Sequence, residues 1–267
     1  MIDLHTHILP GLDDGSKTVE ESLDILRQLQ KAGFETILAT PHVLEGKDFL
    51  SPEEILASAE EVRQAAWKAG ISAEILPGSE NYIFPDMAKW LREGKLLTLG
   101  NAGKYLLVEL PMLEIPHYVD QVFFELQVEG ITPILAHPER YLSLFQEAER
   151  AIEWAKKGVL FQLDYRSVTG RYGSKPKQFA ERMLSSGIIH FLGSDAHRVS
   201  SSDFVDQEAL QYIRKLVGKE EFRKMAVTNP RRMIEGEILL SGGDYSLGDM
   251  PVKREKRKKK FWDWIRG

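Results

Sequence analysis

The first fifteen residues, MIDLHTHILPGLDDG (1–15), place two histidines and two aspartates directly after a short apolar run. The run predicts a buried β-strand, and His5 and His7 stand two residues apart at its end, so that their rings share one side. A proline-glycine turn then leads to Asp13 and Asp14. We therefore expect metal or catalytic chemistry where the first strand ends.

The rest of the chain repeats this order of strand and helix. Seven apolar runs predict strands, each followed by helical or loop sequence: residues 2–6, 35–40, 73–77, 104–110, 131–136, 159–164 and 188–193. Capping boxes at 18–21 and 51–54 mark two helix starts. No tight hairpin signal separates the strands, which favours a parallel sheet in an α/β fold.

A closed or nearly closed (β/α) barrel fits this pattern better than an open doubly wound sheet. Seven strand-helix units fill about 240 residues, a length typical of such barrels. No glycine-rich dinucleotide or phosphate-loop fingerprint follows the first strand. The chain is thus expected to form a barrel over residues 1–240.

Ionisable side chains gather where the predicted strands end. In a parallel barrel all these ends open on one face, where barrel enzymes carry their active sites. Of the seven histidines, five lie at such positions, and only the sixth predicted strand contributes nothing. The candidate ligands are His5, His7, Asp14, His42, Glu80, Glu109, His137, Asp195 and His197.

Imidazole and carboxylate together suit Zn, Mn or Fe, whereas Mg and Ca sites use oxygen ligands alone. Nine ligands are too many for one tetrahedral ion and are enough for two or three, with a carboxylate as a bridge. A single His-x-His or Asp-x-His motif is weak, and Asp13 and Asp14 could be ordinary turn residues. Of these two aspartates we select Asp14 as the ligand.

Composition narrows the chemistry further. The 267 residues include no cysteine, which excludes thiolate metal sites and a cysteine nucleophile and agrees with a reducing compartment. The start of the chain does not resemble a signal peptide, and no apolar run is long enough for a membrane-spanning helix. We therefore expect a cytoplasmic protein.

The charge is divided unevenly between the body of the chain and its end. The net charge is −5, of which residues 253–267 (KREKRKKKFWDWIRG) contribute +6 and the preceding residues −11. This segment follows a glycine-rich break, so residues 241–267 are expected to form a flexible tail. The tail is either a disordered charged terminus or a peripheral membrane contact made by basic and tryptophan side chains. Nucleic acid is not expected as a partner, because the body is strongly acidic.

The sequence resembles the PHP (polymerase and histidinol phosphatase) superfamily, and within it the bacterial tyrosine-protein phosphatases of capsule and exopolysaccharide operons. The stretches that carry the resemblance are DLHTHILPGLDDGS (3–16), ATPH (39–42), PGSE (77–80), LVEL (107–110), AHPERY (136–141) and GSDAH (193–197). The resemblance covers residues 1–240 and implies a distorted (β/α)7 barrel with a trinuclear centre. The metal it implies is Mn, with Fe or Zn as alternatives.

Carried over residue by residue, the resemblance assigns three ligand sets. The first ion takes His5, His7, Glu80 and Asp195; the second takes Glu80, Glu109 and His137; the third takes Asp14, His42 and His197. Hydrolysis is then expected by direct attack of a metal-activated water on phosphorus. Arg140 is the catalytic candidate that holds the phosphate oxygens, since guanidinium matches them bidentately; a structural ion pair is its alternative role.

One departure from the family pattern concerns a second arginine. Family members tend to carry it a few residues after the Asp-x-His motif, where this chain reads RVSSSDF (198–204). Arg198 is the candidate substrate-binding residue that would replace it from a shifted position. Arg166 and Arg171, in the loop after the sixth predicted strand, are further candidates for phosphate or peptide contact.

Three functions remain open at this point. The resemblance implies a metal-dependent protein-tyrosine phosphatase that acts on a phosphotyrosine protein, in the family usually a membrane-associated tyrosine kinase with a tyrosine-rich tail. The second is a PHP phosphoesterase for a small metabolite such as histidinol phosphate or a nucleotide, which would need an enclosing lid. The longest candidate lid is the modest loop 165–177. The third is a non-catalytic, metal-binding regulatory barrel, which the complete ligand set disfavours.

Overall fold

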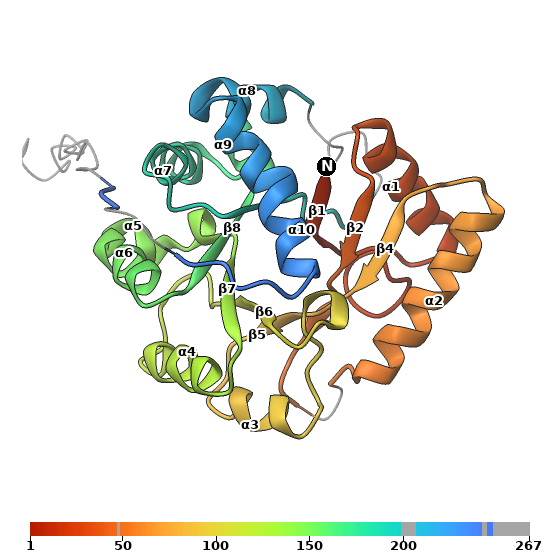
Figure 1. Ribbon diagram of the computed structural model, residues 1–267, viewed down its shortest axis with the longest axis horizontal. Coiled ribbons are helices and arrows are strands. Elements are labelled where there is room, and N and C mark those ends of the chain that lie inside the picture. Colours follow the sequence, from red (N-terminus) through yellow and green to blue (C-terminus); the bar gives the residue numbers. More distant parts are fainter. Residues whose placement is uncertain (47–48, 199–206, 242–244, 248–267) are drawn as a thin grey trace, which may run out of the picture.

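The computed structural model describes residues 1–46, 49–198, 207–241 and 245–247, in which strands and helices alternate (Figure 1). The strands are β1 (Ile2–Thr6), β2 (Thr36–Ala39), β3 (His42–Val43), β4 (Glu74–Pro77), β5 (Glu80–Tyr82), β6 (Tyr105–Glu109), β7 (Thr132–Ala136), β8 (Leu160–Asp164) and β9 (Phe191–Gly193). The helices are α1 (Val19–Lys31), α2 (Pro52–Lys68), α3 (Met87–Arg92), α4 (Val119–Val128), α5 (Leu142–Gln146), α6 (Ala148–Lys156), α7 (Ser174–Ser185), α8 (Gln207–Val217), α9 (Lys219–Arg223) and α10 (Asn229–Ile234).

All described strand pairs are parallel, which confirms the α/β fold expected from the alternation of strands and helices. They form a sheet in the order β1-β2-β4 and a second sheet in the order β3-β5-β6-β7-β8-β9. Each of the seven predicted strands is present. The last of them is shorter than expected, because β9 begins only at Phe191.

The two short strands β3 and β5 are not predicted by the sequence pattern. Each continues the course of a longer strand after a two-residue break, at 40–41 and at 78–79. Pro41 has no N–H for the ladder, and a Cβ at Gly78 would lie 3.0 Å from a methyl carbon of Leu99. Hydrogen bonds still cross both breaks, from Gly78 N to the Ala39 carbonyl and from Glu80 N to the Pro41 carbonyl.

The first and last strands are also joined by backbone hydrogen bonds. Asp195 N donates to the His5 carbonyl and His7 N to the Ala196 carbonyl, each at 2.9 Å. The carboxyl end of β1 and the residues after β9 therefore lie side by side, although they are far apart in the sequence.

Helices α1 to α8 are arranged around the strands (Figure 1). The predicted helix starts are confirmed: the Thr18 hydroxyl accepts from Glu21 N, and Ser51 and Glu54 form a reciprocal capping box. On α1, Ile25 and Leu29 are buried against the sheet while the opposite face is exposed, as expected of an amphipathic surface helix.

A second hydrophobic cluster, here called the inner core, is formed largely by the early residues of the strands. It consists of Ile2, Leu4, Leu38, Leu99, Tyr105, Leu107, Ile134, Ala136, Leu160, Phe191, Met233 and Leu239. Helix α10 crosses in front of the strands in Figure 1 and contributes Met233 to the cluster. The Tyr105 hydroxyl donates to the Glu237 carbonyl and accepts from Leu239 N, which fixes the segment after α10 against the strands.

Candidate metal centre

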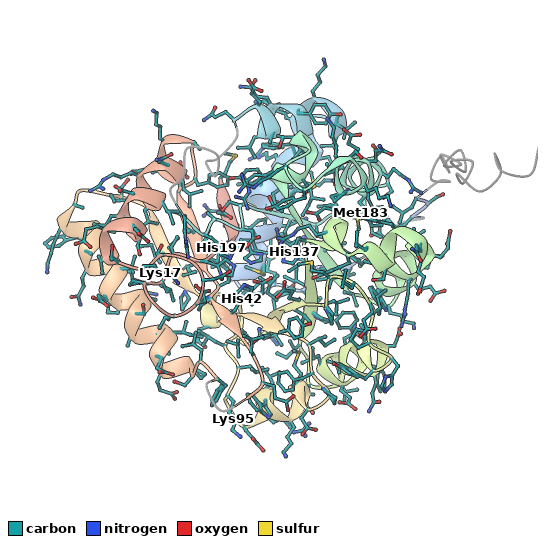
Figure 2. All side chains as sticks on the ribbon, turned by 180° about the vertical axis from the view of Figure 1, so that it is seen from behind. Lys17, His42, Lys95, His137, Met183 and His197 are labelled. Atoms are coloured by element: carbon teal, nitrogen blue, oxygen red, sulfur yellow. The ribbon has the colours of Figure 1, made fainter. Side chains whose placement is uncertain are left out.

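The structure brings all nine predicted ligands together at the carboxyl ends of the strands. Figure 2 shows His42, His137 and His197 close to one another near the middle of the molecule. Rings from distant parts of the chain stack here: the centroids of His7 and His197 lie 3.9 Å apart, and those of His5 and His137 lie 5.7 Å apart. The expectation that strand ends converge on one site is therefore met in the geometry.

Glu80 lies at the centre of the cluster and is fully buried. Its Oε2 lies 3.0 Å from His5 Nε2, 3.3 Å from His7 Nε2 and 3.0 Å from His42 Nδ1. Its Oε1 lies 2.9 Å from His137 Nε2. The position follows from the break before β5, because the register of the short strands pairs Glu80 with His42.

The first group of ligand atoms comes from His5, His7, Glu80 and Asp195, all buried and all within 4.8 Å of one another. The Nε2 atoms of His5 and His7 are 3.0 Å apart. Asp195 Oδ1 lies 3.4 Å from the first of these atoms and 3.1 Å from the second. Two nitrogens and two carboxylate oxygens thus surround one point, as a divalent ion requires.

A second group contains His42, Glu80 and Glu109. The family resemblance assigns His137 to this group in place of His42, and both imidazoles contact the carboxylates of Glu80 and Glu109. Glu109 lies 3.6 Å from His42 Nδ1 through Oε2 and 3.7 Å from His137 Nε2 through Oε1. His42 therefore lies between two groups of ligand atoms rather than in one alone.

The third group joins His7, Asp14, His42 and His197. Asp14 Oδ1 is 3.6 Å from His42 Nε2 and 3.3 Å from His197 Nε2. The Asp14 side chain is 69% exposed, so this group faces solvent, whereas the first group is buried.

The charges within the cluster fit divalent cations. Burial alone would lower the pKa of His5, but the carboxylates of Glu80 and Asp195 outweigh it and raise this pKa to about 9. Burial, followed by repulsion from Glu80, raises the pKa of Glu109 to about 7. Glu80 Oε2 accepts no hydrogen bond of regular geometry from the described residues, although three imidazole nitrogens approach it. Converging lone pairs without such a hydrogen bond are the arrangement that a metal ion completes.

Two side chains outside the nine predicted ligands orient these histidines. Asp13 Oδ2 accepts from His7 Nδ1 at 2.7 Å and from His42 N at 3.0 Å. Gln162 Oε1 accepts from His5 Nδ1 at 3.0 Å. The two contacts to Nδ1 leave the Nε2 lone pairs of His7 and His5 free to face the cluster, as the outer partners of metal-bound histidines do.

The position of Gln162 corrects the expectation that the sixth predicted strand contributes nothing, since this residue lies on β8. No motif marks a lone glutamine within an apolar strand. Asp13 had a signal, because it neighbours the selected Asp14, but spacing alone did not separate the roles of the two aspartates.

Backbone strain also concentrates at the site. His137 and Asp195 have φ angles of 30° and 48°, in the left-handed region that non-glycine residues seldom adopt. Such conformations cost about 1–3 kcal/mol each and persist where the surrounding structure fixes them. Here they turn both side chains from the ends of their strands into the cluster.

The candidate arginines differ in what holds them. Arg140, in the 3-10 turn Pro138–Arg140, donates from NH1 to Asp195 Oδ2 at 2.6 Å. Arg198 is exposed and lies 3.4 Å from the Asp14 carbonyl, and residues 199–206 after it lie outside the described residues. Arg166 is buried and paired with Asp164, so a substrate contact through its guanidinium is not supported. Arg171 is exposed.

A family model described as "Capsular polysaccharide synthesis, CpsB/CapC" matches residues 1–235. The chain belongs to this family. It is 33% identical to the tyrosine-protein phosphatase YwqE of Bacillus subtilis over 96% of this chain and 98% of the relative. It is 31% identical to the tyrosine-protein phosphatase CpsB of Streptococcus pneumoniae over 90% of this chain and 100% of the relative.

Solved structures agree with this membership. A crystal structure from a study of YwqE and of CpsB from Streptococcus pneumoniae, described there as unique metal-dependent tyrosine phosphatases, matches with a TM-score of 0.84. The match has 32% identity and covers 90% of this chain and 96% of that one. The lactonase Lmo2620 of Listeria monocytogenes, at 13% identity and a TM-score of 0.52 over 86% of this chain and 93% of that one, shares the fold alone. Among the described residues, no helix has the length and apolarity needed to cross a bilayer.

Proposed function

We propose that this CpsB/CapC family member is a metal-dependent protein-tyrosine phosphatase. The observation that carries the proposal is the cluster of nine imidazole and carboxylate side chains with the buried Glu80 at its centre, in a chain whose relatives are named tyrosine-protein phosphatases. The chain has no cysteine, so a phosphocysteine route is not available to it.

These side chains are proposed to hold up to three divalent ions, with Mn as the metal, divided among the ions as the family resemblance assigns them. His5, His7, Glu80 and Asp195 would hold the first, Glu80, Glu109 and His137 the second, and Asp14, His42 and His197 the third. Bound there, the ions supply positive charge to the phosphate oxygens and lower the pKa of a coordinated water. The residues themselves hold the ions at fixed positions, with Glu80 shared between the first two.

Arg140 is proposed to bind the non-bridging phosphate oxygens. Its guanidinium is held at one edge by Asp195 and the side chain is 22% exposed, so that the remaining N–H donors can meet an anion. The leaving group of a phosphotyrosine is a phenolate, whose conjugate acid has a pKa of about 10. Such a leaving group needs little help from an acid, so the site can act without a dedicated proton donor.

The finer expectations from the sequence are part of the same proposal. Residues 1–240 would form a single (β/α)7 barrel of the PHP type, supported by the hydrogen bonds between the segments after β1 and β9. The substrate would be the phosphotyrosine tail of a membrane-associated kinase that controls capsule or exopolysaccharide synthesis. Membrane contact through 253–267 stays a prediction, since these residues lie outside the described residues.

The test compares substrates on the metal-reconstituted full chain. A phosphotyrosine peptide from a tyrosine-rich kinase tail, histidinol phosphate and a nucleoside monophosphate are each offered with Mn, Fe or Zn. Preferential hydrolysis of the peptide is expected. The rate should fall about a hundredfold or more in Arg140→Ala, the effect of removing one charged contact to the transition state, and a similar loss is expected in His42→Ala.

Other outcomes overturn the proposal in different ways. Turnover of only a small metabolite would assign the chain to the second class of PHP phosphoesterase with the same centre. Bound metal without turnover of any substrate would support the regulatory role instead.

A further inference from the structure

A continuous series of polar contacts leads from the end of β8 to Arg140. Asp164, the last residue of β8, accepts from Arg166 N at 2.9 Å and from Arg166 NH2 at 3.1 Å. The Tyr172 hydroxyl donates to Asp164 Oδ2 at 2.6 Å and lies 3.0 Å from Arg166 NH2. Tyr172 belongs to the loop between the 3-10 turn Tyr165–Thr169 and α7, and its hydroxyl is held by these two hydrogen bonds.

The ring of Tyr172 faces the guanidinium of Arg140. Arg140 Cζ lies 4.7 Å from the ring centroid, within the range of a favourable cation–π contact. Asp195 Oδ2 is the hydrogen-bond partner of the same guanidinium, and the described residues provide no other. Arg140 is thus held by a carboxylate at one edge and by an aromatic face.

The neighbouring arginines do not replace Arg140 in this arrangement. Arg166 is 5% exposed and donates to Asp164 and to the Asp195 carbonyl, so its role is to hold the loop. Arg171 Cζ lies 5.9 Å from the Tyr172 centroid, at the limit of a cation–π contact. Arg140 has the shorter distance to the ring, and its guanidinium contacts the side-chain carboxylate of the candidate metal ligand Asp195, whereas Arg166 contacts only the backbone carbonyl of that residue.

We propose that Tyr172 is a positioning residue, whose ring holds the Arg140 guanidinium beside Asp195 in the orientation that receives the phosphate. This inference rests on the proposed phosphatase function. An arginine side chain has many rotamers, and a contact that restricts them before the ligand arrives raises affinity by lowering the ordering cost of binding. Loop 165–173 then has a function without being a lid, because it supplies the surface that supports Arg140.

The experiment is a double-mutant cycle with inorganic phosphate as the probe. Binding of phosphate to the Mn-loaded full chain is measured by calorimetry for the wild type, Tyr172→Leu, Arg140→Ala and the double variant. Metal content per chain is determined for each protein, so that loss of ions is not mistaken for loss of the arginine. Tyr172→Phe keeps the ring and removes only the hydroxyl. Arg171→Ala, alone and combined with Tyr172→Leu, is the matched control for the second arginine near the ring.

Tyr172→Leu is expected to weaken phosphate binding about tenfold, a size typical of a partly desolvated cation–π contact. The same change in the Arg140→Ala background should alter binding less than twofold, since there is no guanidinium left to position. Tyr172→Phe should retain affinity within about threefold, because the ring face remains.

Three results would overturn the inference. Equal weakening by Tyr172→Leu in both Arg140 backgrounds would mean that the tyrosine acts through the fold. Unchanged binding in Tyr172→Leu would mean that the ring does not position the guanidinium. Loss of the Tyr172 effect in the Arg171→Ala background alone would transfer the role to Arg171. Coupling between Tyr172 and Arg140 without turnover of a phosphotyrosine peptide by the wild type would contradict the proposed function and leave the positioning role intact.

Discussion

The two ends of the same strands are both buried, but they bury opposite kinds of side chain. Along β6, Tyr105 and Leu107 lie in the inner core, and Glu109, two residues further on the same face, lies in the candidate metal centre. Apolar burial at the first end contributes about 1.5–3 kcal/mol of folding free energy per large side chain. Burial of ionisable groups at the other end opposes folding unless each group has a partner. The start of the strand thus contributes to stability, and its carboxyl end contributes a side chain to the candidate metal centre.

Buried histidines show the same difference. His5, among carboxylates, has its pKa raised to about 9. His190 lies just before β9, where its Nδ1 accepts from Phe161 N and no carboxylate of the described chain pairs with it; burial lowers its pKa to about 4. The depth of burial is similar at the two positions, so the neighbouring charges decide which form of the ring the fold favours.

The largest loss of activity is expected from a change at the carboxyl ends of the strands, where the candidate metal centre lies. Glu80→Gln keeps the shape but removes the charge that four imidazoles share, and hydrolysis of a phosphotyrosine peptide should fall about a thousandfold, the scale of several kcal/mol lost from a metal site. Steady-state kinetics at saturating Mn, with metal content measured in parallel, test this. Full activity in this variant would mean that Glu80 is not a ligand of the metal centre.

A change in the inner core should lower stability and leave turnover almost unchanged. Ile134→Ala removes a fully buried side chain on β7 and should lower the free energy of unfolding by about 3 kcal/mol. Turnover per folded molecule at a permissive temperature should stay within twofold of the wild type. Urea unfolding measures the first quantity and steady-state kinetics on the same preparation measure the second. A large loss of turnover without a loss of stability would contradict the assignment of stability to the start of the strands and of catalysis to their carboxyl ends.

The smallest effect concerns His190 and pH. Because its folded pKa lies below the unfolded value of about 6.5, the unfolded chain takes up a proton that the folded chain refuses as pH falls from 6.5 towards 4. The wild type should therefore lose on the order of 2 kcal/mol at pH 5 through this group, with no contribution above pH 7.

Comparison with His190→Gln isolates the contribution of His190 to the pH dependence of stability, since the groups of the metal centre titrate in both proteins. Urea unfolding at pH 7 and pH 5 should show a smaller drop in the variant. Equal drops in the two proteins would mean that His190 titrates normally in the fold.

The sequence could predict the parts of the molecule that follow local rules. Seven apolar runs predict the seven longer strands, and the convergence of parallel strand ends predicts that the nine candidate ligands lie together. Strands β3 and β5 escaped prediction because they have only two and three residues and depend on pairing with their neighbours. Gln162 could not be predicted because its role comes from its contact with the His5 ring. The buried ion pair of Arg166 with Asp164 likewise depends on the fold and has no signal in the sequence.

The number of metal ions bound at the carboxyl ends of the strands can be measured directly. The full chain is stripped with chelator, equilibrated with Mn by dialysis and analysed for metal per chain, alongside His197→Ala. We expect three ions in the wild type and two in the variant, because His197 belongs to the exposed third group. A wild-type chain that retains no Mn, Fe or Zn would contradict it, because the buried cluster around Glu80 would then be a network of protonated histidines and carboxylates rather than a metal centre.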